Sequence, residues 1–158
     1  MSLVGQSAPL FTLVDTGRKP ISLESYRGKK VLLAFFPAAF TGVCERELCA
    51  IRDAFVNLAR YNAEVLGISV DSPFANAAFA TKNELNYPLL SDYSRYAVTH
   101  YGVAHEDFAG LPSYTAAKRS IFLINEEGVV TYEWVAPNPG VEPDYDAVAA
   151  AVAGVSVG

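Results

Sequence analysis

The sequence predicts an α/β domain in which a central mixed β-sheet is flanked by helices on both faces. Apolar runs of strand length alternate with amphipathic segments in the first half of the chain. A strand, a helix and a second strand in that order imply parallel strands joined by a right-handed crossover. Two later apolar runs are separated by a turn and indicate an antiparallel hairpin. The length of 158 residues fits a single domain, 1–158.

The first half of the chain supplies the expected parallel strands. Residues 31–36 and 64–70 are continuous apolar runs, which are typical of central strands buried on both faces. Before them, residues 11–14 and 21–23 flank a short turn and predict an N-terminal β-hairpin extension. Between the two runs, apolar residues at spacings of three and four predict an amphipathic helix from about 42 to 61. The apolar stripe of that helix consists of Leu48, Ile51, Phe55 and Leu58.

The second half supplies shorter elements. Asp71-Ser72-Pro73 is a helix-start signal, because proline suits the first turn of a helix. The pattern then predicts a helix over 74–85, a short strand or extended turn over 87–92, a short helix over 93–101 that Gly102 ends, an irregular stretch over 103–118, a hairpin of 120–124 and 129–134, and a closing helix over 145–152.

Composition excludes several classes of function. The formal net charge is -5 and no block of Lys and Arg stands out, so neither nucleic acid nor an anionic membrane is an expected partner. The longest apolar run, residues 31–40, is too short for a transmembrane helix, which needs about 20 residues. Without a basic and apolar leader at its N-terminus, the chain is expected to be cytoplasmic. Two cysteines and two histidines match no common zinc spacing, so we expect no metal and no other cofactor.

Cys44 is the strongest candidate for chemistry. It falls in the first turn of the helix predicted from about 42, where unsatisfied backbone N–H groups and the helix dipole favour a thiolate. Taken alone, the residues leave open whether Cys44 is a nucleophile or a buried structural cysteine. Thr41 could be an N-cap, could orient the thiolate or a bound oxygen, or could do both. Pro37 could end the strand or wall off the thiolate from water.

The pattern proline-x3-threonine-x2-cysteine-x2-glutamate at Pro37, Thr41, Cys44 and Glu47 resembles the active-site motif of peroxiredoxins. The resemblance implies a thioredoxin-like fold and extends along nearly the whole chain. The other segments that match the family are Gly5–Leu13, Tyr26–Lys29, Tyr87–Asp92 and Arg119–Ile124.

The resemblance also implies a role for each site residue. Cys44 would be the peroxidatic cysteine, which attacks hydrogen peroxide or an alkyl hydroperoxide and becomes a sulfenic acid. Thr41 would hydrogen-bond the peroxide, and Pro37 would shield the pocket. Arg119 would hold the thiolate and polarise the O–O bond, since a guanidinium stabilises charge developing on the leaving oxygen. Glu47 would pair with Arg119 or a neighbouring arginine, or would simply occupy the exposed face of the helix.

Cys49 follows Cys44 by five residues, a spacing that resembles the bacterioferritin-comigratory (Q-type) class. There the second cysteine resolves the sulfenic acid, and a thioredoxin-like dithiol reduces the disulfide. Five helical residues place the two Cα atoms roughly 8–9 Å apart, whereas a disulfide needs them within about 7 Å. We therefore expect the first turns of the helix to unwind after oxidation. Cys49 could instead be a small buried residue, and residues 38–42 are similar to one-cysteine, AhpE-like relatives.

The peroxidase is expected to be a monomer or a homodimer. Three other functions compete with it as interpretations of the sequence. A thiol–disulfide oxidoreductase usually carries Cys-x-x-Cys, but four residues intervene between Cys44 and Cys49. A cysteine hydrolase would need His100 or His105 as its base, and no motif supports either histidine. A non-enzymatic binding module has only Phe40 and the loop 103–117 as a possible contact surface.

Overall fold

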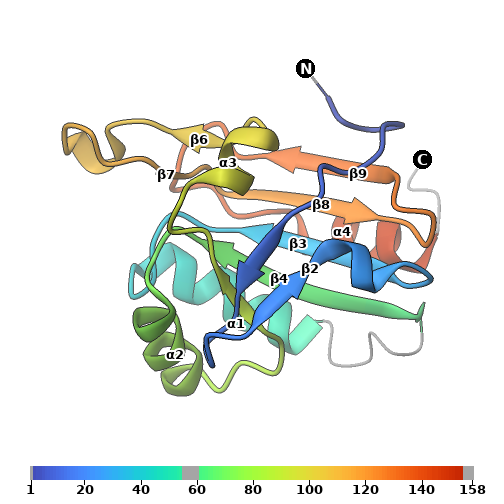
Figure 1. Cartoon of the computed structure of the whole chain (residues 1–158), viewed down its shortest axis with the longest axis horizontal. Helices are drawn as coiled ribbons and strands as arrows, with labels where there is room; N and C mark the ends of the chain where they lie inside the picture. The colour runs from blue at the N-terminus through green and yellow to red at the C-terminus, as the bar shows by residue number, and fades with distance from the viewer. Residues whose placement is uncertain (1, 55–60, 155–158) are drawn as a thin grey trace.

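The computed structural model of the chain describes residues 2–54 and 61–154 (Figure 1). Strands and helices alternate as the apolar pattern predicts. In chain order the elements are β1 (Thr12–Val14), β2 (Pro20–Ser22), the 3-10 helix η1 (Leu23–Tyr26), β3 (Lys30–Phe35), α1 (Gly42–Ala54), β4 (Ala63–Ser69), α2 (Pro73–Lys82), β5 (Leu89–Ser91), α3 (Tyr96–His100), β6 (Ala104–His105), the 3-10 turn η3 (Phe108–Gly110), β7 (Ala116–Ala117), β8 (Ser120–Ile124), β9 (Val130–Val135) and α4 (Tyr145–Ala153).

A seven-stranded mixed sheet forms the centre of the molecule, with the strand order β2-β1-β5-β4-β3-β8-β9. β3, β4 and β5 run parallel, whereas β8 pairs antiparallel with both β3 and β9. The predicted parallel core and the predicted C-terminal hairpin are thus confirmed. The N-terminal hairpin of β1 and β2 also forms, but it is more than an extension. Val14 of β1 pairs with Ser91 of β5, so the hairpin lengthens the central sheet.

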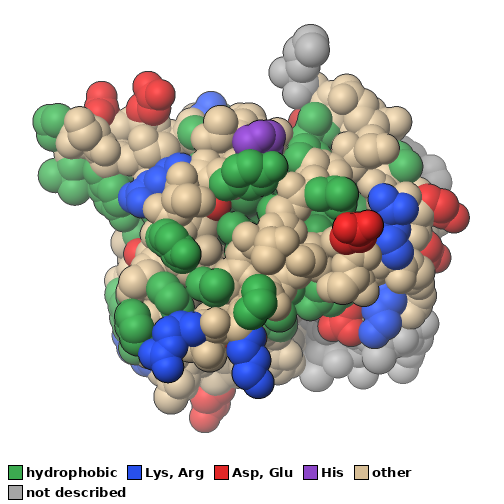
Figure 2. Space-filling view, in the orientation of Figure 1, with side chains coloured by type: hydrophobic (Ala, Val, Ile, Leu, Met, Phe, Trp, Pro, Cys, Tyr) green, Lys and Arg blue, Asp and Glu red, His purple; other side chains and the backbone are tan. Residues whose placement is uncertain are grey.

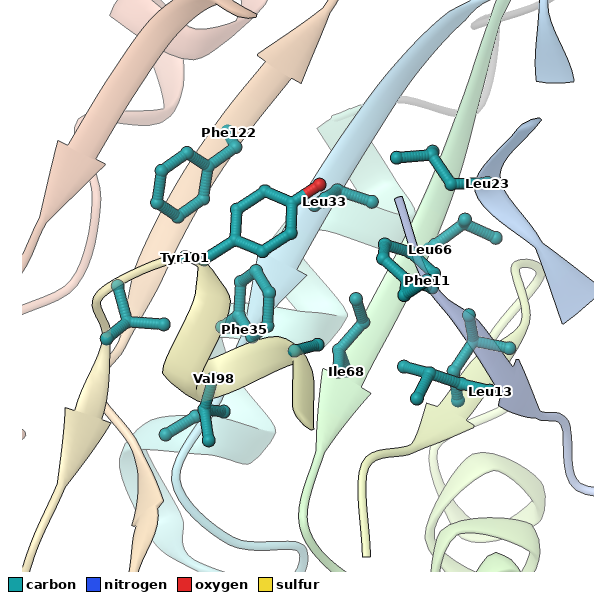
Figure 3. Packing of buried hydrophobic residues seen from close by; sticks show 14 of the residues in the cluster. Phe11, Leu13, Leu23, Leu33, Phe35, Leu66, Ile68, Val98, Tyr101 and Phe122 are labelled. Atoms are coloured by element: carbon teal, nitrogen blue, oxygen red, sulfur yellow. The ribbon is translucent and has the colours of Figure 1, made fainter. Parts of the chain in front are cut away.

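Helices cover both faces of the sheet, as predicted. The alternation of side chains along β3 sends Leu33 and Phe35 to one face and Leu32 and Ala34 to the other. The first face packs under α3 and the chain that follows it, where Tyr101 meets Phe35 (Figure 3). α1 and α4 cover the second face, and α2 packs beside α1 through a smaller apolar cluster. That cluster consists of Phe36, Cys44, Leu48, Phe79 and Leu89.

Several boundaries differ from the sequence prediction. Phe55 and Leu58, expected in the apolar stripe of the first long helix, lie outside the described residues. α2 ends at Lys82 rather than 85, and Ser72 caps its start by accepting from the amide of Ala75 at 3.1 Å. The prediction of an irregular stretch over 103–118 is wrong where β6 pairs with β7. Those strands have two residues each, too few for the alternation that identifies a strand.

Three properties of the described residues bear on possible partners: the distribution of charge, the length of the helices and the grouping of metal-binding side chains. On the face shown in Figure 2, basic and acidic side chains are interspersed among apolar ones. No helix within 2–54 and 61–154 is long and apolar enough to cross a membrane. Within the same residues, no group of three or more His, Cys, Asp and Glu side chains is placed to hold a metal ion.

Candidate active site

The loop between β3 and α1 carries the candidate nucleophile. Phe36 is still tied to the sheet, because its amide donates to the carbonyl of Ile68 at 2.9 Å, and the buried Pro37 follows directly. The loop then turns through Phe40, which adopts a left-handed backbone with φ 65°. The amide of Glu45 donates to the carbonyl of Thr41 at 2.9 Å and closes the first turn of α1. Cys44 therefore lies in that first turn, as the sequence predicts.

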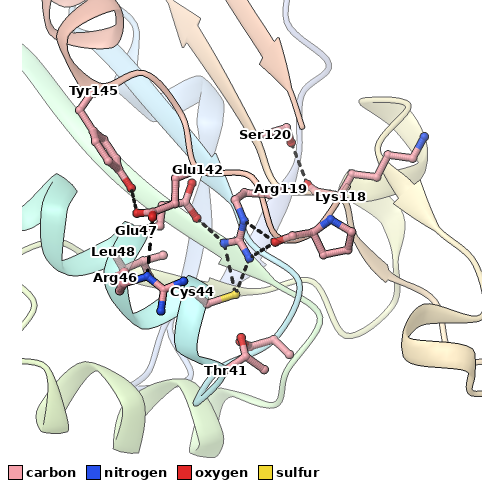
Figure 4. Close-up of polar contacts among 12 residues, drawn as sticks. Thr41, Cys44, Arg46, Glu47, Leu48, Lys118, Arg119, Ser120, Glu142 and Tyr145 are labelled. Atoms are coloured by element: carbon pink, nitrogen blue, oxygen red, sulfur yellow. Dashed lines mark hydrogen bonds and ion pairs between the residues drawn. The ribbon is translucent and has the colours of Figure 1, made fainter. Parts of the chain in front are cut away.

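Arg119 forms the principal polar contact of Cys44 (Figure 4). Cys44 is fully buried, and its Sγ accepts from both Nη1 and Nη2 of Arg119 at 3.3 Å. The two residues are 75 positions apart in sequence. The register of the sheet brings them together, because Phe35 at the end of β3 pairs with Ser120, the residue after Arg119. A guanidinium is always charged and presents its N–H donors in a rigid fork, so Nη1 and Nη2 of Arg119 can both bond to the one sulfur.

Glu47 and the carbonyl of Pro139 hold the guanidinium in place. Oε1 of Glu47 accepts from Nη1 of Arg119 at 2.8 Å. The oxygen of Pro139 accepts from Nη2 at 2.9 Å and from Nε at 3.2 Å. Glu47 is fully buried, so of the predicted alternatives the pair with Arg119 is confirmed and the exposed helix face is wrong. One helical turn separates Cys44 from Glu47, which lets both side chains reach the same guanidinium.

The buried carboxyl of Glu47 has an unusual titration. Burial raises its pKa to about 7, although the neighbouring Arg119 acts in the opposite direction. Among the described residues, Oε2 of Glu47 has no hydrogen-bond partner, and a buried carboxylate oxygen without a donor disfavours the charged form. The pKa of Arg119 is raised above its ordinary value: burial lowers it, but Glu47 and Cys44 outweigh that effect. The guanidinium thus stays charged whichever form Glu47 takes.

Thr41 lies one turn before Cys44, and its hydroxyl donates to the carbonyl of Ala38 at 2.8 Å. The backbone of Thr41 does occupy the capping position, since its carbonyl accepts the first helical hydrogen bond. Its side chain, however, bonds to the loop carbonyl of Ala38 and not to an amide in the described part of α1. Because the hydroxyl hydrogen is given to Ala38, the oxygen retains lone pairs with which it can accept from a bound molecule.

Cys49 lies in the same unbroken helix as Cys44, and neither cysteine forms a disulfide. The thiol of Cys49 is half-buried and donates to Oδ1 of Asn83 at 3.4 Å. Asn83, the residue that caps the end of α2, also accepts from Arg52 through its backbone carbonyl. With both cysteines reduced, Cys49 and Arg52 thus fasten α1 to the end of α2 through their bonds to Asn83.

The two histidines lie in other surroundings. His100 bonds to the carbonyl of Tyr96 at 2.8 Å and stacks on its ring, and His105 packs edge-on against Phe108. Cys44 instead takes both of its side-chain hydrogen bonds from Arg119. An arginine stays protonated and cannot act as the base that a cysteine hydrolase needs, so these contacts do not support a hydrolase.

Three contributors escaped the sequence reasoning. Pro139 acts through its carbonyl, which no side-chain pattern reveals. Asn83 contributes because it ends α2 beside α1, where it accepts from the thiol of Cys49. The sequence places Asp71 only in a helix-start signal, and in the structure its carboxylate accepts from the amide of Ala39 in the loop at 2.8 Å. Asp71 could have been found from topology, because the carboxyl ends of the adjacent parallel strands β3 and β4 meet at one edge of the sheet.

Comparisons with known proteins identify the family of the chain. The model of the AhpC/TSA family matches residues 4–133. A putative peroxiredoxin bcp of Coxiella burnetii is 40% identical over 131 residues, covering 83% of this chain and 87% of that protein. An alkyl hydroperoxide reductase E of Mycobacterium tuberculosis is 38% identical over 132 residues, which cover 82% of each chain.

Solved structures give the same result for the fold. Peroxidoxin BcpB from Mycobacterium tuberculosis superposes with a TM-score of 0.83 at 28% identity, covering 98% of this chain and 97% of that one. Peroxiredoxin Q of Xanthomonas campestris superposes with a TM-score of 0.80 at 26% identity, covering 91% of this chain and 90% of that one. The predicted thioredoxin-like fold is thereby confirmed. The chain belongs to the AhpC/TSA family and is a peroxiredoxin, a thiol-dependent peroxidase.

Proposed function

We propose that this peroxiredoxin reduces hydrogen peroxide and alkyl hydroperoxides with Cys44 as its peroxidatic cysteine and Cys49 as its resolving cysteine. The observation that carries the proposal is the pair of 3.3 Å contacts between the guanidinium of Arg119 and the buried Sγ of Cys44. A cysteine held in this way at a helix start is an activated nucleophile.

In the first step the thiolate of Cys44 attacks one oxygen of the peroxide, and an S–O bond forms as the O–O bond breaks. The electron pair of the O–O bond goes to the leaving oxygen, which takes a proton and departs as water or an alcohol. Arg119 stabilises the charge on that oxygen, since its fork lies in a buried site. Thr41 accepts a hydrogen bond from the peroxide, and the buried Pro37 keeps water from the sulfur.

In the second step the sulfur of Cys49 attacks the sulfenic acid of Cys44, water leaves, and a disulfide forms. Both cysteines lie in the wound helix α1, so their Cα atoms are roughly 8–9 Å apart by helical geometry, beyond the reach of a disulfide. The first turns of α1 must unwind, and the contact of Cys49 with Asn83 must break. A thioredoxin-like dithiol then reduces the disulfide by exchange.

A one-cysteine cycle is the second candidate, because the chain is similar to relatives of both kinds. It is 38% identical to peroxiredoxin Q of Populus jackii and 38% identical to alkyl hydroperoxide reductase E. In that cycle an external thiol would reduce the sulfenic acid directly, and Cys49 would be structural. Cytoplasmic location and the choice between monomer and homodimer stay predictions from the sequence.

Peroxide consumption with a thioredoxin system, together with mass spectrometry after one equivalent of peroxide, tests both proposals. We expect Cys44→Ser to abolish peroxide consumption. We expect Cys49→Ser to react with peroxide once and then stop at a sulfenic acid. Wild-type protein should show the mass of an intramolecular disulfide. A persistent sulfenic acid in the wild type, unaffected by Cys49→Ser, would establish the one-cysteine cycle, and an active Cys44→Ser would overturn the assignment of the nucleophile.

A further inference from the structure

The peptide unit between Ala38 and Ala39 is held at both of its polar ends. Its carbonyl accepts from the hydroxyl of Thr41 at 2.8 Å, and its N–H donates to Oδ2 of Asp71 at 2.8 Å. One rigid plane carries both groups, because a peptide bond does not rotate freely. The orientation of this plane therefore fixes where Thr41 can place its hydroxyl hydrogen.

Asp71 is itself held firmly where β4 ends. The hydroxyl of Ser69 donates to the same Oδ2 at 2.8 Å, and the hydroxyl of Ser91 donates to the backbone carbonyl of Asp71 at 2.5 Å. Ser69 also contacts Asn76 on α2 at 3.1 Å. Ser69, Asn76 and Ser91 are buried, so the carboxylate rests on a rigid platform formed by β4, β5 and α2.

The hydrogen bonds form a chain that ends at the active site. A carboxylate accepting from an N–H makes a stronger, charge-assisted bond. The charge of Asp71 polarises the peptide unit, which makes the carbonyl of Ala38 a better acceptor for the hydroxyl of Thr41. Hydrogen bonds in such a chain strengthen one another. The oxygen of Thr41 thereby becomes more negative and directs its lone pairs away from Ala38.

We infer that Asp71 is a positioning residue for the peroxide step and that it acts through the 38–39 peptide on Thr41. It orients the hydroxyl so that the oxygen accepts from the peroxide beside Cys44. This inference rests on the proposed roles of Thr41 and Cys44 and adds to them a residue that touches neither the peroxide nor the thiol.

The test is the second-order rate constant for oxidation of Cys44 by hydrogen peroxide, measured by stopped flow in a double-mutant cycle. We expect Asp71→Ala to lower the rate by about 10- to 100-fold, the range in which small misplacements of a positioning group fall. Asp71→Asn keeps an oxygen acceptor of the same size but loses the charge, so its rate should lie between those of the wild type and Asp71→Ala. In a Thr41→Val background, Asp71→Ala should change the rate by less than about threefold, since the group through which it acts is already gone.

Two further variants separate positioning from folding. Asp107→Ala removes a carboxylate that accepts from the amide of Ser113 at 2.8 Å in an exposed loop, and it should leave the rate unchanged. Asp71→Ser, too short to reach Ala39, replaces Asp71→Ala if the latter does not fold. An equal loss from Asp71→Ala with and without Thr41 would overturn the inference, as would a wild-type rate in Asp71→Ala while Thr41→Val stays slow. A wild-type rate in Thr41→Val would instead overturn the proposed role of Thr41.

Discussion

Replacing Glu47 with glutamine should remove a pH dependence of stability that the wild-type protein shows near neutrality. The carboxyl of Glu47 is fully buried, and burial raises its pKa from 4.5 to about 7 in spite of the ion pair with Arg119. Glutamine has nearly the same volume and can still accept from Nη1 of Arg119 through its amide oxygen. The substitution therefore removes the titration and keeps the packing.

The sign follows from proton binding. Between pH 4.5 and about pH 7 the folded protein holds a proton on Glu47 that the unfolded chain has released. This group's contribution to stability is fully present below pH 4.5 and is lost as the pH rises through about 7. Such a difference in pKa corresponds to about 3 kcal/mol at 1.36 kcal/mol for each pH unit. The wild type should thus lose about 3 kcal/mol relative to Glu47→Gln across this range.

Urea unfolding followed by the fluorescence of the single tryptophan, Trp134, measures the free energy of unfolding at each pH. Glu45→Gln on the same helix is the matched control. The hydrogen bond from Lys82 lowers the pKa of Glu45, so its contribution is lost only as the pH falls below this window.

A difference between wild type and Glu47→Gln that stays flat from pH 4.5 to about pH 8 would refute this reasoning. Glu47 would then be ionised throughout, and the attraction of Arg119 would outweigh the effect of burial.

Three further predictions concern other parts of the structure. Arg119→Met should slow the reaction of Cys44 with peroxide by about 10²–10³-fold in stopped flow, because the donors to the leaving oxygen are lost, and a smaller effect would contradict that role. Asn83→Ala removes the acceptor of the Cys49 thiol, a bond worth about 1 kcal/mol. Disulfide formation, followed by quenched-flow mass spectrometry, should become about fivefold faster. A slower or unchanged rate would show that Asn83 does not hold α1. Phe35→Ala should lower the free energy of unfolding in urea by about 3–5 kcal/mol, and a loss under about 1 kcal/mol would mean that the core collapses around the cavity.

The central sheet was predictable because its strands are chemically simple. β3 is buried on both faces, so its apolar run is unbroken and easy to recognise. β6 and β7 were missed because they have two residues each and, within residues 2–54 and 61–154, pair only with one another. The attachment of the N-terminal hairpin to β5 was missed for another reason. Pairing between strands far apart in the sequence depends on how the sheet assembles, and no local pattern records it.

Within the site, local chemistry was predictable and long-range placement was not. A cysteine at a helix start can be recognised from the sequence around it, which made Cys44 a candidate, while the family motif assigned it the role of nucleophile. The family motif, not periodicity, pointed to Arg119, since its meeting with Cys44 depends on the register of β8 on β3. The burial of Glu47 was missed because the helical pattern places Glu47 on the polar face of α1. The segment before α4 lies against that face, where Glu142 pairs with Arg46 of α1 at 3.6 Å.

α1 must satisfy two opposed requirements in the proposed cycle. Wound, it holds Cys44 and Glu47 on the same guanidinium, the geometry that makes the thiol reactive. Unwound, it lets Cys49 reach the sulfenic acid, but Cys44 must then leave Arg119. A sulfenic acid that forms while α1 is still wound remains beside the groups that activate peroxide, so a second peroxide competes with unwinding. The contacts that fasten α1, from Glu47 to Arg119 and from Cys49 to Asn83, oppose unwinding in this proposed cycle, so we expect a weaker contact at Cys49 to raise the peroxide concentration that overoxidises Cys44.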